Sequence, residues 1–354
     1  MIFRSPVPPV DIPRVDIPTF LLDQIATDPL WQNRQRSVFT DAFSKESVSI
    51  EQLCTRAHQL ASGWQNTAGL KRGQVVALVA PNDIHYSTLL LSVLLVGGIV
   101  TLVNPAYTAQ EMAFQLTDSG AAFVVSDHEM LAQAQAAAAT AGVPKTQIYT
   151  LQPSSQLKNG VPSVFTLASD RDYRRIRLGA DEAQTTTAFL CYSSGTTGRS
   201  KGVMTTHYNM IANVCQLVGL KKHHQSLLRG ATVGGVLPFY HIYGLNVLLH
   251  ANILEGVSTI VFRKFDLELF AQCVERHRIA FAYLVPPIIL GLARQSIVEK
   301  YDLSSLKGVI SGAAPLSVAL AQELAQKFNV EVGQGFGMTE LSPVVHLGLN
   351  TAVR

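Results

Sequence analysis

The sequence predicts an α/β fold made of two halves, each built on a sheet of mostly parallel strands with helices on both faces. Three observations support this prediction. Short runs of β-branched and apolar residues alternate with segments of helical periodicity along a chain of 354 residues. Hydrophobic residues make up 47% of the composition, which is enough to fill a large core. Strands that alternate with helices are typical of parallel sheets covered by helices.

Ten runs are predicted to form strands, with helices between them. The runs are 74–80, 99–103, 121–127, 147–151, 186–193, 233–239, 258–263, 280–286, 307–312 and 330–337. Capping boxes mark the beginning of two helices, one formed by Ser49 with Gln52 and the other by Thr108 with Glu111. In open parallel sheets ligands bind beyond the carboxyl ends of the strands, so the loops that follow these runs are the candidate sites.

Residues 86–103 form an apolar run that approaches the length of a membrane span. Gly97 and Gly98 divide this run into a piece of helical length and a β-branched piece, IVTLV. Such a division is typical of a buried helix that leads into a parallel strand. We therefore expect no membrane span.

Composition argues against several other classes of function. The net charge is +3 and only 15% of residues are charged, so we expect no nucleic-acid partner. The four cysteines are far apart and form no CxxC pair, which argues against a zinc site or a disulfide framework. The basic clusters 171–177 and Lys221 with Lys222 are interpreted as solvated loops without a function. Segment 1–18 contains prolines and no apolar signal region, so an intracellular location, cytoplasmic or peroxisomal, is expected.

Segment 152–184 is comparatively rich in polar residues and prolines, and it is the best candidate for a domain boundary. The predicted first half is therefore 1–184, which includes an N-terminal extension. The predicted second half is 185–354, which carries the candidate site.

Four unusual loops follow predicted strands. They are SSGTTGRSKG (193–202), YHIYG (240–244), GAAPLS (312–317) and GQGFGMTE (333–340). The first loop can wrap phosphates, because its glycines let backbone N–H groups converge on an anion while hydroxyls and Lys201 add donors and charge. Its spacing differs from that of the common nucleotide loop, in which four residues stand between a glycine and a Gly-Lys-Ser/Thr end.

The other three loops carry weaker signals by themselves. In GQGFGMTE, Phe336 offers a flat face for a purine and Glu340 offers a hard oxygen for Mg²⁺. His241 stands among aromatic residues, where a histidine is more often part of a packed core than of a site. The small residues of GAAPLS are equally typical of close packing. On the residues alone, both of these alternatives stay open.

Taken together and in this order, the four loops resemble the successive signatures of the AMP-forming acyl-adenylate superfamily. Segment VNPAYTAQEMAFQLTDSGA, residues 103–121, is similar to the branch that contains 4-coumarate:CoA ligases and luciferases. The resemblance covers essentially the whole chain. It implies the large N-terminal domain of an enzyme that activates a carboxylic acid with Mg²⁺ and ATP to an acyl-AMP. The acyl group is then transferred to coenzyme A.

The resemblance also implies a role for particular residues. The ATP loop comprises Ser193, Ser194, Gly195, Thr196, Thr197 and Lys201, and the nucleotide contacts are Ala313, Gln334, Gly335, Phe336 and Thr339. Glu340 holds the metal, Lys264 contacts coenzyme A, and the catalytic group comprises His241, Lys201, Thr339 and Glu340. The acid pocket comprises His241, Tyr243, Val247, Ala313, Gly335 and Val344. Because these side chains include no buried cation, we expect an uncharged aryl or medium-chain acid.

The sequence departs from the family pattern at three places. Ser200 stands where proline is usual, and Phe336 stands where tyrosine is commoner. Family members continue beyond the position of Arg354 with a ribose-binding aspartate, a hinge and a C-terminal domain that carries a catalytic lysine. The resemblance therefore implies that this domain is missing here. The alternative function is a shortened, non-catalytic relative that binds a nucleotide or an acyl group.

Overall fold

The fold is described from a computed structural model, which covers residues 5, 7–152, 160–193, 199–223 and 228–348. The helices are α1 (Ile17–Thr27), α2 (Ile50–Gly63), α3 (Tyr86–Leu95), α4 (Ala109–Asp118), α5 (Leu131–Ala141), α6 (Ala180–Thr185), α7 (His207–His223), α8 (Asn252–Leu254), α9 (Leu267–His277), α10 (Pro286–Arg294) and α11 (Val318–Phe328). Two further helical segments matter for the site, η6 (Gly244–Ala251) and η8 (Thr339–Leu341).

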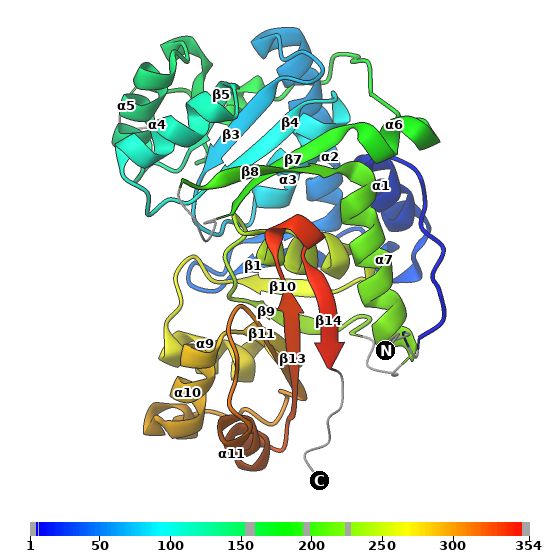
Figure 1. The fold of residues 1–354 in the computed structure, drawn as a ribbon, viewed down its shortest axis with the longest axis vertical. Helices are drawn as coiled ribbons and strands as arrows, with labels where there is room; N and C mark the ends of the chain where they lie inside the picture. The colour runs from blue at the N-terminus through cyan, green and yellow to red at the C-terminus, as the bar shows by residue number, and fades with distance from the viewer. Residues whose placement is uncertain (1–4, 6, 153–159, 194–198, 224–227, 349–354) are drawn as a thin grey trace.

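The strands form two sheets (Figure 1). The six-stranded sheet has the order β6 (Ile148–Thr150), β5 (Ala121–Ser126), β3 (Val75–Val79), β4 (Ile99–Val103), β7 (Thr187–Ser193) and β8 (Lys201–Thr206). The eight-stranded sheet has the order β14 (Val344–Gly348), β13 (Glu331–Gly337), β12 (Gly308–Ser311), β11 (Phe281–Leu284), β9 (Thr232–Gly235), β10 (Ser258–Val261), β1 (Ser37–Asp41) and β2 (Ser47–Ser49).

All ten predicted runs contain strands, and neighbouring strands among them pair in parallel. Both predicted capping boxes are also present, at the beginnings of α2 and α4. The sequence did not predict β1, β2, β8 and β14. Strands β2, β8 and β14 pair antiparallel at sheet edges, so the sheets are mixed, although parallel pairs dominate.

The inner strands of each sheet are buried on both faces, because their successive residues enter different cores. In β3, Val76 packs into the central core while Ala77 faces α4 and α5. In β11, Tyr283 enters the same central core while Ala282 faces α9, α10 and α11. The central core also takes in α3, η6 and one face of α7. The α/β prediction with helices on both faces is therefore confirmed.

The predicted division between residues 184 and 185 does not separate the two sheets. Strands β1 and β2 lie in the same sheet as β10, although they precede the division by more than a hundred residues. Strands β7 and β8 follow the division but complete the sheet of β3 and β4. The chain therefore crosses between the sheets on both sides of the predicted boundary.

Residues 86–103 form α3 and β4, with Gly97 between them at a φ of 77°. Glycine adopts this left-handed conformation without the steric cost that a side chain would add. In the described residues, no helix has the length and apolar character that crossing a bilayer requires.

Two buried histidines in the central region make stability depend on pH. His207 accepts a hydrogen bond at Nδ1 from the Ile17 backbone N–H at 3.1 Å, which requires a neutral ring. Burial lowers the pKa of His207 to about 4, although Asp16 partly opposes the shift. Burial also lowers the pKa of His250 to about 3, and His207 adds to that shift.

We expect the free energy of unfolding to decrease as the pH falls from about 6.5 to 4. Between these values the unfolded chain binds protons at His207 that the folded chain does not, so stability rises with pH across this window. Each such histidine changes the slope by up to about 1.4 kcal/mol per pH unit. Urea unfolding at a series of pH values would measure the slope. His207→Gln should make the slope shallower, and an unchanged slope would contradict the assignment.

Candidate functional site

Two of the four predicted loops leave the sheet side by side. Strands β12 and β13 are parallel neighbours, and Ser311 pairs with Gln334 in their register. The Gln334 side chain also supports the GAAPLS loop, because its Oε1 accepts a hydrogen bond from the Leu316 N–H at 3.2 Å. A predicted nucleotide contact therefore has a structural partner in the neighbouring loop.

The GAAPLS loop is held close to the YHIYG loop. A Cβ at Gly312 would lie 2.5 Å from a carbon of the Tyr243 ring, so only glycine allows this approach. Ala313 has a φ of 67°, a conformation that costs energy for a residue with a side chain. Strained backbone of this kind is common where a loop is shaped for a ligand.

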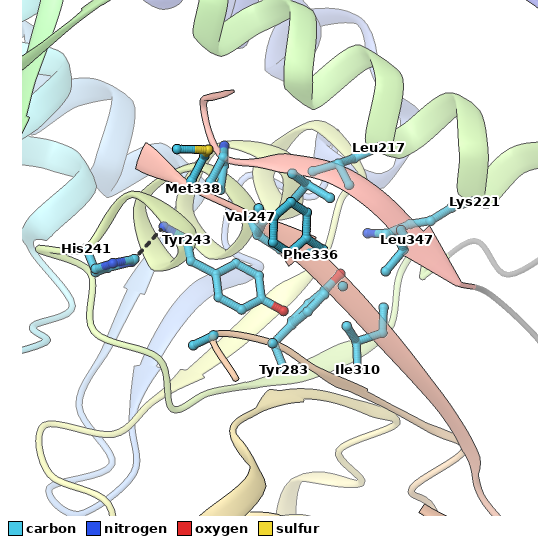
Figure 2. Close-up of a pocket in the computed structure, with 16 residues that line it drawn as sticks. Leu217, Lys221, His241, Tyr243, Val247, Tyr283, Ile310, Phe336, Met338 and Leu347 are labelled. Carbon is cyan, nitrogen blue, oxygen red and sulfur yellow. Dashed lines mark hydrogen bonds between the residues drawn. The ribbon is translucent and has the colours of Figure 1, made fainter. Parts of the chain in front are cut away.

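A cavity of about 60 Å³ lies between these loops and α7 (Figure 2). It is lined by Leu217, Lys221, His241, Tyr243, Val247, Tyr283, Ile310, Gly312, Ala313, Gly335, Phe336, Gly337, Met338, Pro343, Val344 and Leu347. All six residues predicted for the acid pocket are among them. Their role as ligands stays a prediction, but the structure brings them to one cavity.

His241 lines this cavity and is exposed. It is therefore not part of a packed core, which is the more usual place for a histidine among aromatic residues. Its Nδ1 accepts a hydrogen bond from the Tyr243 N–H at 3.3 Å, shown as a dashed line in Figure 2. That bond leaves the proton of the neutral ring on Nε2. Desolvation by the surrounding wall lowers the pKa of His241, which favours the neutral form.

The structure overturns the prediction that the pocket has no buried cation. Lys221 lines the cavity, and its side chain is only 3% exposed. Its Nζ lies 2.5 Å from a carboxylate oxygen of Glu255, whose side chain is 1% exposed. Burial by itself would lower the pKa of Lys221, but Tyr283 and Glu255 reverse that effect and raise it. Lys221 is therefore charged and paired, and it does not lie on a solvated loop.

A helical pattern in the sequence could have revealed this position. Met210, Val214, Leu217 and Lys221 follow one another at intervals of four, three and four residues, and all four are buried on one face of α7. From the sequence, Lys221 and Lys222 were interpreted as a solvated charge cluster. The apolar helical stripe that Lys221 continues was not recognised.

Tyr243 and Tyr283 form one wall of the cavity, with ring centres 6.2 Å apart and nearly perpendicular planes. Burial raises the pKa of both hydroxyls, and the neighbouring Lys221 partly opposes this at Tyr283. Both hydroxyls therefore keep their protons at neutral pH. Figure 2 shows the Tyr283 hydroxyl and the Lys221 nitrogen pointing toward the same part of the cavity.

The predicted phosphate loop and the GQGFGMTE loop meet at a polar contact. The Ser193 hydroxyl donates a hydrogen bond to a Glu340 carboxylate oxygen at 3.2 Å, across 147 residues of sequence. Lys201 begins β8 and pairs with Ser193 in the strand register, and its side chain is exposed. Ser194, Gly195, Thr196 and Thr197 lie outside the described residues.

The remaining predicted residues differ in exposure. Thr339 is 7% exposed within η8, whereas Phe336 is 61% exposed, with its ring centre 6.1 Å from that of His346. Lys264 is exposed after β10 and is not among the residues that line the cavity. Within the described residues no group of three His, Cys, Asp or Glu side chains gathers to hold a metal. One carboxylate beside a hydroxyl, as at Glu340, still suits Mg²⁺ that arrives with phosphates.

A comparison with protein-family models matches residues 30–354 to the family described as AMP-binding enzyme. Among curated proteins, the chain is 30% identical over 356 residues to 4-coumarate–CoA ligase 3 of Arabidopsis thaliana, covering 99% of this chain and 61% of that protein. It is 32% identical over 348 residues to 4-coumarate–CoA ligase 5 of Oryza sativa subsp. japonica, covering 98% and 62%. The chain thus spans less than two thirds of these relatives.

Solved structures agree in fold. A long-chain-fatty-acid-CoA ligase from Archaeoglobus fulgidus superimposes with a TM-score of 0.84 at 24% identity, covering 98% of this chain and 68% of that one. A red-emitting luciferase from Phrixothrix hirtus gives a TM-score of 0.80 at 24% identity, with coverage of 97% and 64%. ATP-bound MatB from Rhodopseudomonas palustris gives 0.78 at 26% identity, with coverage of 94% and 61%.

Proposed function

The chain belongs to the AMP-binding enzyme family, and from this premise we propose that it activates a carboxylic acid with ATP and passes the acyl group to coenzyme A. In the proposed reaction the carboxylate oxygen attacks the α-phosphorus of ATP, and pyrophosphate leaves. The coenzyme A thiol then attacks the carbonyl of the acyl-AMP, and AMP leaves. The names of the curated relatives, which are 4-coumarate–CoA ligases, support this reaction class.

The observation that carries the proposal is the contact between Ser193 and Glu340. It joins the loop proposed to hold phosphates to the loop that borders the cavity through Phe336 and Met338. A nucleotide held between these loops would present its α-phosphate to an acid in the cavity. Bringing two reactants together in this way removes much of the entropic barrier to their reaction.

Different residues of this chain have different roles in the proposed reaction. Lys201 and the hydroxyls of the phosphate loop stabilise the charge that grows on the phosphate oxygens. The neutral His241 donates from Nε2 at the junction of acid and nucleotide. Glu340 and Ser193 would hold Mg²⁺, which supplies positive charge to the phosphates when bound.

The cavity limits the size of the acid in this conformation. At about 60 Å³ it is smaller than the engineered cavities of about 150 Å³ that admit a benzene ring. Phe336 and Met338 line it and are 61% and 47% exposed, so they can change rotamer with little loss of packing. We propose an aryl or medium-chain acid that enters when these two side chains move.

Nucleotide binding tests the phosphate loop. If Lys201 contacts the outer phosphates, Lys201→Ala should weaken ATP binding by roughly tenfold to a hundredfold and leave AMP binding nearly unchanged. Calorimetry with ATP and AMP would measure both affinities. Lys264→Ala is the matched control, because its proposed contact is with coenzyme A. Equal losses for ATP and AMP would contradict the role of Lys201, and a wild-type chain that binds neither nucleotide would contradict the proposed function.

A further inference from the structure

The segment that leads into His241 is held by a side chain from the other sheet. Asn82 follows β3 in the six-stranded sheet, whereas His241 follows β9 in the eight-stranded sheet. These sheets lie one above the other in Figure 1. Asn82 is only 4% exposed, and a buried amide of this kind is almost always hydrogen-bonded. Its partners therefore show what the side chain holds.

The Asn82 amide pairs with the backbone in the manner of a peptide group. Its Nδ2 donates to the Leu237 carbonyl at 2.9 Å, and its Oδ1 accepts a hydrogen bond from the Phe239 N–H at 2.7 Å. Nδ2 also donates to the Gly235 carbonyl, at 3.3 Å. A residue of a parallel strand donates to the residue before its partner and accepts from the residue after it. Asn82 therefore stands in for a strand residue opposite Pro238, beyond the point where β9 ends.

The turn that carries His241 closes on the residue between these two partners. The His241 N–H donates to the Pro238 carbonyl oxygen at 3.2 Å. A Cβ at Gly244 would lie 2.1 Å from the same oxygen, so the helix that follows the turn also packs closely against Pro238. Asn82 fixes the backbone on each side of Pro238. A change at Asn82 is therefore expected to move the His241 ring.

The segment has a second anchor, which does not depend on the Asn82 amide. Phe239 is fully buried, and its ring packs nearly perpendicular to that of Tyr86, with ring centres 5.6 Å apart. Without the amide, this packing would keep the segment folded. The Leu237 carbonyl and the Phe239 N–H would be left buried without a partner, however, which is unfavourable. The backbone would rotate toward new partners, and the turn beyond it would rotate as well.

We propose that Asn82 is a positioning residue for His241, which sets where the imidazole lies although Asn82 itself is not among the residues that line the cavity. The consequence for catalysis rests on the proposed function, in which His241 acts at the junction of acid and nucleotide. A displacement of about 1 Å in such a site can cost roughly a hundredfold in rate. Because the link joins the two sheets, the placement of His241 depends on how they pack.

The state of the His241 ring reports its position in the 354-residue chain without any ligand. In the wild type, Nδ1 accepts from the Tyr243 N–H, and burial lowers the pKa of the ring. Asn82→Leu should raise this pKa by about half a pH unit or more, because a displaced ring loses the bond and gains water. NMR of histidine-labelled protein would measure it, with the His241 signal identified by its absence in His241→Gln.

Two further variants make this measurement decisive. Asn82→Ala leaves room for a water molecule, so it should fold more readily than Asn82→Leu and shift the pKa of His241 in the same direction. Asn252→Leu is the matched control, because it also removes a fully buried amide, one that donates to Thr259 at the far end of the helical segment that follows His241. It should leave the pKa of His241 nearly unchanged.

Three results would overturn the inference. The first is a pKa of His241 that is unchanged in every folded Asn82 variant, and the second is an equal rise in Asn252→Leu. The third is a chain that folds with neither Asn82→Leu nor Asn82→Ala, because the amide would then support the whole fold and not the position of one ring.

A double-mutant cycle tests the consequence for binding. The probes are 3-phenylpropanoate and hexanoate, measured by calorimetry in the presence of AMP. Asn82→Leu should weaken the tighter-binding acid by about tenfold in the wild-type background and by less than about threefold in the His241→Gln background. Equal losses in both backgrounds would show that Asn82 does not act through His241 and would overturn the inference. Failure of both acids to bind the wild-type chain would count against the proposed function alone, because the pKa of His241 is measured without a ligand.

Discussion

Replacing Lys221 by methionine is expected to destabilise the fold by about 3–5 kcal/mol, because it leaves the Glu255 carboxylate buried and without its cation. The carboxylate has little access to water, since the Glu255 side chain is only 1% exposed. Protonation of Glu255 would relieve part of the cost, so the loss should be smaller at acidic pH than at neutral pH. Urea or guanidinium unfolding of the variant and the wild type would measure the difference.

A double variant separates the missing charge from the missing packing. Adding Glu255→Leu to Lys221→Met removes both charges, and it should restore most of the lost stability because apolar residues often replace buried ion pairs at little cost. Arg294→Met breaks the exposed pair with Glu323 and should cost no more than about 1 kcal/mol. A loss below about 1 kcal/mol for Lys221→Met, or a double variant as unstable as the single one, would contradict this account.

Most of the strands that the sequence predicted are buried on both faces, although β13 is largely exposed toward its carboxyl end. Strand β3 is an example, since each residue of Val75–Val79 is buried and the run is continuously apolar. Strand β8 was missed because it lies at a sheet edge, where only one of its six residues is fully buried, and because its sequence begins inside a loop rich in serine and glycine. Periodicity reports burial, so edge strands leave a weak signal.

Pairings between distant segments could not be predicted from the sequence, for a different reason. Strand β1 lies beside β10, more than two hundred residues later, and no local pattern in either strand encodes the partner. The contact between Ser193 and Glu340 is of the same kind, because motif order implied that the two loops share a ligand but not that they touch. Chain topology decides such contacts, and local propensity does not.

The acid pocket was predicted only in part, since motifs point to loops rather than to the surfaces that face them. Tyr243, Ala313 and Val344 were identified from the resemblance, and all three line the cavity. Lys221 and Tyr283 come from the interior of α7 and β11, where no motif drew attention to them. Lys221 continues the apolar face of a helix although it is charged. That pattern in the sequence would have allowed Lys221 to be predicted as a pocket residue.

Replacing Glu340 by glutamine is expected to remove the dependence of ATP binding on Mg²⁺. The carboxylate is exposed beside the Ser193 hydroxyl, where a hard cation carried in with the phosphates would find one charged and one neutral oxygen. Glutamine preserves the size of the side chain and its ability to accept from Ser193, but it supplies no charge. The loss should therefore appear only when the metal is present.

Calorimetry with excess Mg²⁺ should give an ATP affinity at least about a hundredfold lower in Glu340→Gln than in the wild type. This loss corresponds to a charge-assisted contact with the metal whose free energy is near the upper end of the range usual for hydrogen bonds to charged groups. With EDTA in place of Mg²⁺ the two proteins should bind ATP equally. Glu331→Gln is the matched control, because Glu331 is exposed at the beginning of β13, whereas Glu340 lies in η8 beyond the other end of that strand. A variant that loses affinity equally with and without Mg²⁺ would show that Glu340 supports the loop through Ser193 and does not contact the metal.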